Sequence, residues 1–311
     1  MDAQNLPKIP PPKKITPLKR TVAYLCGLLA ECTNYFQFTG TFDWEIHRVS
    51  VPLPQLSAGK TIRMLHLSDF HVSRVVPLRF IENAIDLGLA QQPDIICLTG
   101  DYVTHKMPDD IQKYRDILAK LPAAAPTFAI FGNHDCCYPG KSPADFIDTL
   151  SVGRLLNDAG ITLLFNRSET VSVQGETLQI AGLGDLASRN MLPEHALQLK
   201  QPSRLAVAET PELPDETTDP PVILLSHNPD TKAFLKKYRW DLMLCGHAHG
   251  GQLHIPGVGA LYAPISDMRF LEGLHRWENR WIYVTRGIGN VHGIRINCRP
   301  WISVVELQGK N

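Results

Sequence analysis

The sequence lacks a net charge, a long apolar run and an internal repeat. Its 31 lysine and arginine residues equal its 31 aspartate and glutamate residues, so it has no global positive field of the kind that non-specific nucleic-acid binding needs. No run of about 18 apolar residues is present, which disfavours a conventional membrane-spanning helix. The 22 glycines and 24 prolines follow no period, which excludes collagen and simple repeats. With 44% hydrophobic and 20% charged residues, the chain predicts a globular body of one or two domains.

Paired cysteine motifs are also missing. The seven cysteines include no C-x-x-C pair, which argues against a secreted disulfide framework and against a structural zinc ribbon. Cys97 and Cys245 lie in apolar runs, where a reduced thiol behaves as a small hydrophobe. For the adjacent Cys136 and Cys137, two small neutral side chains are favoured over a strained vicinal disulfide. The pattern predicts a reducing compartment, the cytoplasm.

The first 45 residues differ in composition from the rest of the chain. Between Ala3 and Ala30 there are five basic residues and no acidic one, and five of the first 17 residues are proline. The segment Thr21–Ala30 is apolar but short, so it is either an interfacial membrane anchor or a helix packed on the domain. A cleaved signal peptide is disfavoured because the arm is long, rich in proline and without an A-x-A cleavage site. We therefore predict a basic arm, residues 1–45, and a single domain, residues 46–311.

From Thr61 onward, short apolar runs alternate with amphipathic segments of helical length. This pattern predicts βαβ units around a buried, largely parallel sheet. Gly175 is expected at a hairpin turn, and residues 201–221, rich in proline and acidic residues, are expected to form an exposed connection. Strands are expected at residues 62–67, 95–98, 128–131, 161–165, 170–173, 178–181, 222–225, 242–245, 281–285 and 302–307, and helices at 78–90, 110–121 and 142–157.

Residues able to bind a metal follow five of these predicted strands. Because ligands bind beyond the carboxyl ends of the strands in an open α/β sheet, these side chains are expected to converge at one site. Alternation along an extended D-x-H or H-x-H segment would place its two polar side chains on one side. Glycine directly before three of the strand-end groups allows a sharp turn and a close approach of the backbone. The groups are Asp69 and His71; Asp101; Asn133, His134 and Asp135; His227; and His247 and His249.

A single histidine near a strand end is more often an ordinary hydrogen-bonded residue than a ligand. His66, His105 and His195 are interpreted in that way. Asp101 alone would suit a helix cap, and Asn133 alone would suit a turn. The functional interpretation depends on the whole set, which occurs in one order along the chain.

That ordered set, Asp69-Phe70-His71, Gly100-Asp101, Gly132-Asn133-His134-Asp135, Ser226-His227 and Gly246-His247-Ala248-His249, closely resembles the calcineurin-like metallophosphoesterase family. The resemblance covers roughly residues 60–308. It implies an α/β fold, a two-sheet β-sandwich flanked by helices, with a two-metal centre. The run Gly246–Gln252, with Arg286-Gly287-Ile288-Gly289 and Arg299-Pro300, resembles the membrane-associated bacterial subgroup, although Trp301 stands where that subgroup usually has an acidic residue.

The resemblance also implies roles for the individual residues. Two divalent metal ions would be bound, and the nitrogen and oxygen ligands without a thiolate suit Mn²⁺, Fe or Zn²⁺, of which we favour Mn²⁺. His134 would give a proton to the leaving oxygen, with Asp135 fixing its tautomer. One ion would take Asp69, His71 and His249, the other Asn133, His227 and His247, and Asp101 would bridge the two.

The sequence thus predicts a metal-dependent hydrolase of phosphodiester or pyrophosphate bonds. Arg269, Arg286 and Arg295, in late loops, are candidates for binding the substrate phosphate. The resemblance and the basic arm favour a lipid-linked envelope precursor such as UDP-2,3-diacylglucosamine, cut into a lipid monophosphate and UMP, at the cytoplasmic face of the inner membrane. A soluble phosphodiesterase is the alternative. A nuclease is disfavoured by the neutral charge, and a metal-free binding scaffold by the complete set of ligands.

Overall fold

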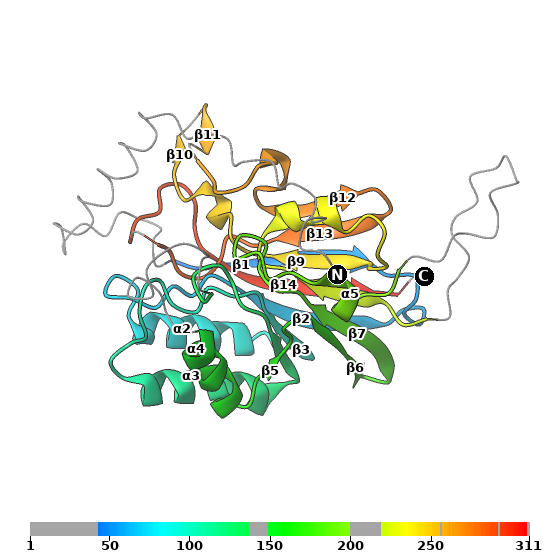
Figure 1. The fold of residues 1–311 in the computed structure, drawn as a ribbon, viewed down its shortest axis with the longest axis horizontal. Coiled ribbons are helices and arrows are strands. Elements are labelled where there is room, and N and C mark those ends of the chain that lie inside the picture. The colour runs from blue at the N-terminus through cyan, green and yellow to red at the C-terminus, as the bar shows by residue number, and fades with distance from the viewer. Residues whose placement is uncertain are drawn as a thin grey trace, which may run out of the picture.

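Two six-stranded β-sheets form the centre of the fold, with helices packed against the outer face of the first (Figure 1). The computed structural model describes residues 43–136, 149–199, 219–255, 257–260, 262–291 and 293–309. Most of the predicted basic arm therefore lies outside the described residues, as do Cys137, the expected helix start at Ser142 and most of the 201–221 connection. Among the residues described, no helix is both long and apolar enough to cross a membrane.

The first sheet has the order β1-β14-β2-β3-β4-β5. Only the pairing of β14 with β2 is antiparallel. The sheet is therefore largely parallel, as the alternation of strands and helices predicts. Its strands are β1 (Glu45–Pro52), β2 (Thr61–Leu67), β3 (Ile95–Leu98), β4 (Thr127–Ala129), β5 (Thr162–Leu163) and β14 (Trp301–Gln308), and its helices are α2 (Leu78–Leu89), α3 (Ile111–Ala124) and α4 (Thr149–Asp158).

The second sheet has the order β12-β13-β9-β8-β7-β6. Its three central pairings are parallel and its two outer pairings are antiparallel. Gly175, with φ of +84°, lies in the β6–β7 hairpin turn, as predicted. The strands are β6 (Arg167–Val173), β7 (Glu176–Gly182), β8 (Val222–Leu225), β9 (Leu242–Cys245), β12 (Gly273–Trp277) and β13 (Arg280–Val284); the shorter elements are α5 (Pro193–Ala196), β10 (His254–Ile255), β11 (Gly259–Ala260) and the 3₁₀ turns η3 (Pro229–Phe234), η4 (His249–Gly251) and η5 (Met268–Phe270).

Burial on both faces explains the continuous apolar strands. In β2, Leu65 and Leu67 face the helical layer, whereas Ile62 and Met64 face the second sheet. Successive side chains of a strand point to opposite faces, so a strand covered on both sides is apolar at nearly every position. The β-sandwich expected from the family resemblance is therefore confirmed. The alternation pattern alone suggests one sheet, but the strands form two.

Four strands, β1, β10, β11 and β12, were not predicted. β1 and β12 lie at the edges of their sheets and keep exposed or partly exposed residues, and β10 and β11 are only two residues long. The strand expected at residues 161–165 is only two residues long, and Phe165 beyond it is 42% exposed. Edge strands carry weaker apolar patterns than central strands, and a two-residue strand carries none, so an apolar pattern does not reveal these four.

Candidate metal centre

Nine predicted site residues follow the carboxyl ends of strands β2, β3, β4, β8 and β9. The first three strands run parallel in one sheet, and the last two run parallel in the other. The backbone links that region across the sheets, because the amide N–H of Ile288, after β13, donates to the carbonyl oxygen of Ser68, after β2, at 3.0 Å. The site therefore lies where the strand ends of the two sheets meet.

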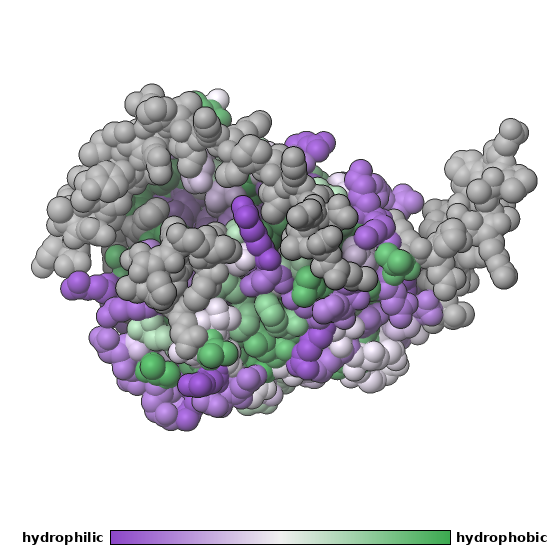
Figure 2. All heavy atoms as spheres, viewed as in Figure 1, coloured by the Kyte–Doolittle hydropathy of each residue, from purple (hydrophilic) through white to green (hydrophobic). Residues whose placement is uncertain are grey.

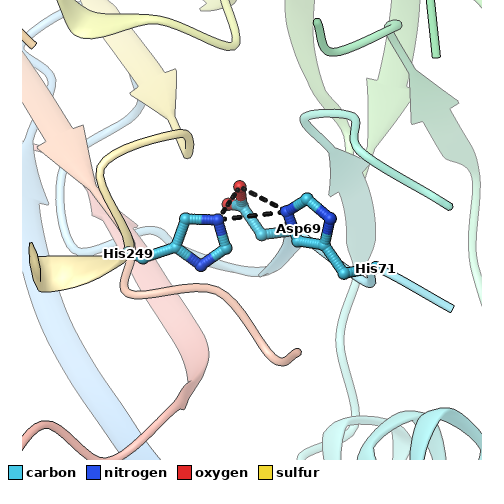
Figure 3. A group of neighbouring side chains, drawn as sticks. All are labelled: Asp69, His71 and His249. Carbon is cyan, nitrogen blue, oxygen red and sulfur yellow. Dashed lines mark hydrogen bonds and ion pairs between the residues drawn. The ribbon is translucent and has the colours of Figure 1, made fainter. Parts of the chain in front are cut away.

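Asp69, His71 and His249 form a first buried group (Figure 3). The Nε2 atoms of His71 and His249 lie 3.1 Å apart, and Nε2 of His249 is 3.2 Å from Oδ1 of Asp69. Nε2 of His71 is 3.9 Å from the same carboxylate oxygen. Their converging donor atoms are spaced closely enough to surround one ion.

Asp101, His227 and His247 form a second buried group. Oδ2 of Asp101 lies 3.1 Å from Nε2 of His227 and 3.4 Å from Nε2 of His71, which belongs to the first group. One carboxylate oxygen therefore stands between the two groups, as a bridging ligand would. Oδ1 of the neighbouring Asn133 is buried and has no hydrogen-bond partner among the described residues.

In two of the histidines, one ring nitrogen donates a hydrogen bond to a backbone carbonyl, which leaves the other nitrogen to face the site. Nδ1 of His227 lies 2.6 Å from the carbonyl oxygen of Thr99, and Nε2 of His247 lies 3.1 Å from that of Pro264. A carbonyl oxygen only accepts, so each of these nitrogens carries a hydrogen, and in the neutral ring the other nitrogen then has the lone pair. Such outer hydrogen bonds are the usual way to orient histidine ligands. Together with the unpartnered Asn133 oxygen, this arrangement fits a pair of divalent ions.

Burial keeps most of the imidazoles neutral. It lowers the pKa of His247 to about 3 and holds the pKa values of His71 and His249 well below the usual range. For His227, burial acts in the same direction, but the Asp101 carboxylate outweighs it and raises the pKa to about 10. Without bound metal, Asp101 and a protonated His227 thus form a buried ion pair. A metal ion would replace that proton.

Five predicted ligands have left-handed backbone conformations, with φ between 49° and 67°. The expectation that D-x-H and H-x-H are extended segments is therefore wrong. The side chains meet because the chain turns sharply after each strand. Left-handed non-glycine residues cost roughly 1–3 kcal/mol each and gather at functional sites. These residues are Asp69, His71, Asp101, His247 and His249.

Two of the motif glycines are required by close packing, not by a left-handed backbone. A Cβ atom on Gly246 would lie 2.0 Å from Oγ of Ser68 and 2.3 Å from Oδ2 of Asp69. A Cβ atom on Gly132 would lie 2.2 Å from Oδ1 of Asp101. Any side chain at these positions would displace the carboxylates.

Asp135 does not fix His134, which corrects the expected pairing of the two side chains. The Asp135 carboxylate accepts the backbone N–H groups of Asp101, Tyr102 and Gly132, at 2.6, 2.9 and 2.8 Å. It therefore holds the Asp101 and Asn133 loops together, and burial raises its pKa to about 8.

Nδ1 of His134 instead lies 2.8 Å from the carbonyl oxygen of Thr104 and donates to it. The Thr104 hydroxyl also lies 3.4 Å from Nδ1 of His71. The His134 ring meets the His71 ring edge-on, with centroids 4.9 Å apart, and is only partly buried. His134 thus lies beside both groups, close to His71 and Asp101, and its Nδ1 is engaged by Thr104.

The three candidate arginines have different surroundings. Arg269 is 82% exposed and bound to Asp267. Arg286 makes two bonds to Glu272, at 2.6 and 2.7 Å, and lies 4.3 Å from the ring centre of Trp301. Glu272 therefore supplies the carboxylate that partners Arg286, and Trp301 supplies an aromatic ring beside its guanidinium group.

Arg295 is fully buried and binds protein groups. Its guanidinium donates to the carbonyl oxygens of Arg286 and Gly289, both at 2.6 Å, and to that of His249 at 3.1 Å. These hydrogen bonds fix the backbone of the loop that carries His249. Phosphate binding by the three arginines stays a prediction, and Arg295 is the least suited to it.

Three other histidines and one cysteine of the described residues lie outside the two groups. His66 is buried with Nε2 2.8 Å from Oγ1 of Thr99, and His195 is exposed on α5. The exposed His105 has its ring 6.2 Å from that of His134. Cys136 is a free, buried thiol 3.7 Å from Nδ2 of Asn190.

The sequence does not reveal the backbone carbonyls that orient the ligands, because every residue has a carbonyl group whatever its side chain. Sequence reasoning also missed Asp185. This acidic residue follows β7, as the predicted ligands follow their own strands, so the same rule would have found it.

Comparisons with known proteins identify relatives of this chain. The family model described as calcineurin-like phosphoesterase matches residues 62–251. A phosphodiesterase, YaeI of Escherichia coli, is 41% identical over 79% of this chain and 82% of its own length. The uncharacterized metallophosphoesterase YkuE of Bacillus subtilis is 29% identical, covering 80% of each chain. The UDP-2,3-diacylglucosamine pyrophosphatase LpxG of Chlamydia trachomatis is 27% identical over 79% of this chain and 83% of its own.

Proposed function

Because the chain belongs to the calcineurin-like phosphoesterase family and is a metal-dependent phosphoester hydrolase, we propose that its substrate is lipid-linked. The bond cut would be a diphosphate, as in UDP-2,3-diacylglucosamine, yielding a lipid monophosphate and UMP. The main support for a hydrolytic site is that Asp101 lies within reach of both buried groups of candidate ligands.

Within that site, the first ion would be held by Asp69, His71 and His249, and the second by Asn133, His227 and His247, with Asp101 shared. When bound, two divalent ions activate water at neutral pH and stabilise the attacking and leaving oxygens of an in-line displacement. We favour Mn²⁺, since nitrogen and oxygen ligands without thiolate suit it.

The charges of the site favour a phosphate anion. Two divalent ions carry four positive charges, and the carboxylates of Asp69 and Asp101 offset two of them. The centre therefore attracts a phosphate group even though the whole chain is neutral.

His134 would act on the leaving group. Nδ1 donates to Thr104, so the imidazole is held with Nε2 facing away from that contact. A proton carried on Nε2 would be given to the leaving oxygen as the ester bond breaks. Asp135 contributes by fixing the two ligand loops, not by contact with substrate.

Two observations support a lipid-linked substrate. LpxG, whose name gives UDP-2,3-diacylglucosamine as its substrate, is a relative over most of both chains. Apolar residues also gather on the face shown in Figure 2. Just beyond β5, the 42%-exposed Phe165 packs edge-on against Phe131, two residues before Asn133. The basic arm would hold the enzyme at the cytoplasmic face of the inner membrane.

A phosphodiesterase acting on soluble esters is the second candidate, favoured by the greater identity to YaeI. Turnover of UDP-2,3-diacylglucosamine, a phospholipid, a cyclic nucleotide and single-stranded DNA separates the candidates. Release of UMP from the first compound at a kcat/KM at least tenfold above the others would support our proposal. Equal or better turnover of the cyclic nucleotide would reject the lipid-linked substrate and keep the hydrolase.

A further inference from the structure

Asp185 is a buried acidic residue that the two groups above leave unused. It follows β7, which runs parallel to β8, and the N–H of Leu183 bonds to the carbonyl oxygen of Leu225 at 3.1 Å. The chain beyond β7 therefore lies beside the chain beyond β8, which carries His227. Asp185 is 1% exposed, as buried as His227 itself.

The loop after β7 is built to hold this carboxylate in place. Oδ2 of Asp185 accepts the N–H of Ser188 at 2.7 Å, and the loop closes with the N–H of Asn190 on the Asp185 carbonyl at 3.4 Å. Oδ1 of Asn166 accepts the N–H groups of Gly184 and Leu192 at 2.8 and 2.9 Å, at the two ends of the loop. A loop tied at both ends fixes the position of its side chains.

Asp185 is nevertheless incompletely satisfied. Its Oδ1 is buried without a hydrogen-bond partner, and no basic nitrogen lies within 4.0 Å of its carboxylate among the described parts of the chain. Oδ1 of Asn190, in the same loop, is also buried and without a hydrogen-bond partner among the described residues. Burying an uncompensated carboxylate costs several kcal/mol, so such a group is kept where a positive charge is at hand.

A metal ion bound at His227 would supply the positive charge that the Asp185 carboxylate lacks. The loop after β7 also borders the loop that carries Asn133, because Nδ2 of Asn190 lies 3.7 Å from Sγ of Cys136, three residues after Asn133. His227 must be neutral to bind an ion, and the ion then brings two charges to the same place.

We propose that Asp185 is a positioning residue for the second metal ion, supplying negative charge from outside the ligand set. It would strengthen binding at the position formed by Asn133, His227 and His247 and leave the position at Asp69, His71 and His249 nearly unchanged. The inference rests on the proposed two-ion centre.

The experiment is an Mn²⁺ titration of chelator-treated full-length protein, in which electron paramagnetic resonance reads the free ion. In Asp185→Asn, the amide oxygen still accepts the Ser188 N–H, and only the charge is lost. We expect the second equivalent to bind about 10–100-fold more weakly and the first to change less than about threefold. Asp185→Glu keeps the charge and should restore much of the affinity. Asp158→Asn removes an exposed carboxylate at the end of α4 and is the matched control.

Thermal unfolding separates this role from a merely structural one. Without metal, removing a buried uncompensated charge should leave the Asp185→Asn protein at least as stable as wild type, whereas its gain in Tm on adding Mn²⁺ should be smaller. Equal loss of Tm with and without Mn²⁺, failure of the variant to fold, or unchanged binding of the second equivalent would each overturn the inference. Wild-type protein that binds fewer than two equivalents would instead contradict the two-ion centre itself.

Discussion

Asp101 should be the least replaceable residue of the site. Its Oδ2 lies 3.4 Å from Nε2 of His71 and 3.1 Å from Nε2 of His227, so one carboxylate serves both groups. At an effective dielectric of about 20, two unit charges about 4 Å apart interact by about 4 kcal/mol, and two divalent ions at that separation repel by about 16 kcal/mol. A carboxylate about as close to both ions offsets this repulsion by about 16 kcal/mol.

A terminal carboxylate does less. Asp69 lies in the first group only, and its attraction for that one ion is about 8 kcal/mol on the same scale. Asp101→Asn should therefore release both ions, whereas Asp69→Asn should mainly weaken the first position. Activity of Asp101→Asn should fall to below about 10⁻³ of wild type, because the chemistry depends on both ions.

The assay is metal content by mass spectrometry after dialysis against micromolar Mn²⁺, together with hydrolysis of a chromogenic phosphodiester. Asp69→Asn is the matched control, because it makes the same chemical change at a terminal ligand. Two equivalents of metal and near-normal turnover in Asp101→Asn would refute the bridging role. A larger loss in Asp69→Asn than in Asp101→Asn would refute the ranking.

Three further predictions follow from the site and the arm. His134→Ala should lower kcat by roughly 10²–10⁴ with metal content intact, and an equal defect for nitrophenyl and alkyl esters would contradict a proton given to the leaving group. Gly246→Ala should lower Tm and bound metal, because its Cβ would meet the Asp69 carboxylate at 2.3 Å, whereas Gly175→Asn, in an open turn, should keep both metal ions. Deleting residues 1–35 should spare hydrolysis of a small soluble ester and weaken co-sedimentation with anionic vesicles at low salt; equal binding by both forms, or by neither, would remove the arm as support for a lipid-linked substrate.

The central strands and the convergence of the site were predictable because both follow from simple rules. Buried strands such as β3 and β9 are apolar throughout, which gives an unmistakable pattern. Parallel strands bring their carboxyl ends to one edge, so Asp101 and Asn133 must be neighbours once β3 and β4 are paired. Neither rule needs knowledge of long-range packing.

The local chemistry was harder to foresee. The motif order suggested that Asp135 partners His134, but its carboxylate instead collects three backbone N–H groups from two loops. Arg295 looked like a phosphate ligand because it is an arginine in a late loop, yet it is fully buried against the His249 loop. Sequence order cannot show which backbone groups lie unsatisfied near a charged side chain, and those groups decide where the side chain points.

The arrangement of the site also links its chemistry to the packing of the two sheets. Asp69, His71 and Asp101 come from the first sheet, whereas His227 and His249 come from the second. An ion bound by Asp69, His71 and His249 would therefore join the sheets at the end where their strands meet. Because the ligand backbones are held in left-handed conformations that cost free energy, metal binding would offset that cost only when both sheets are in place.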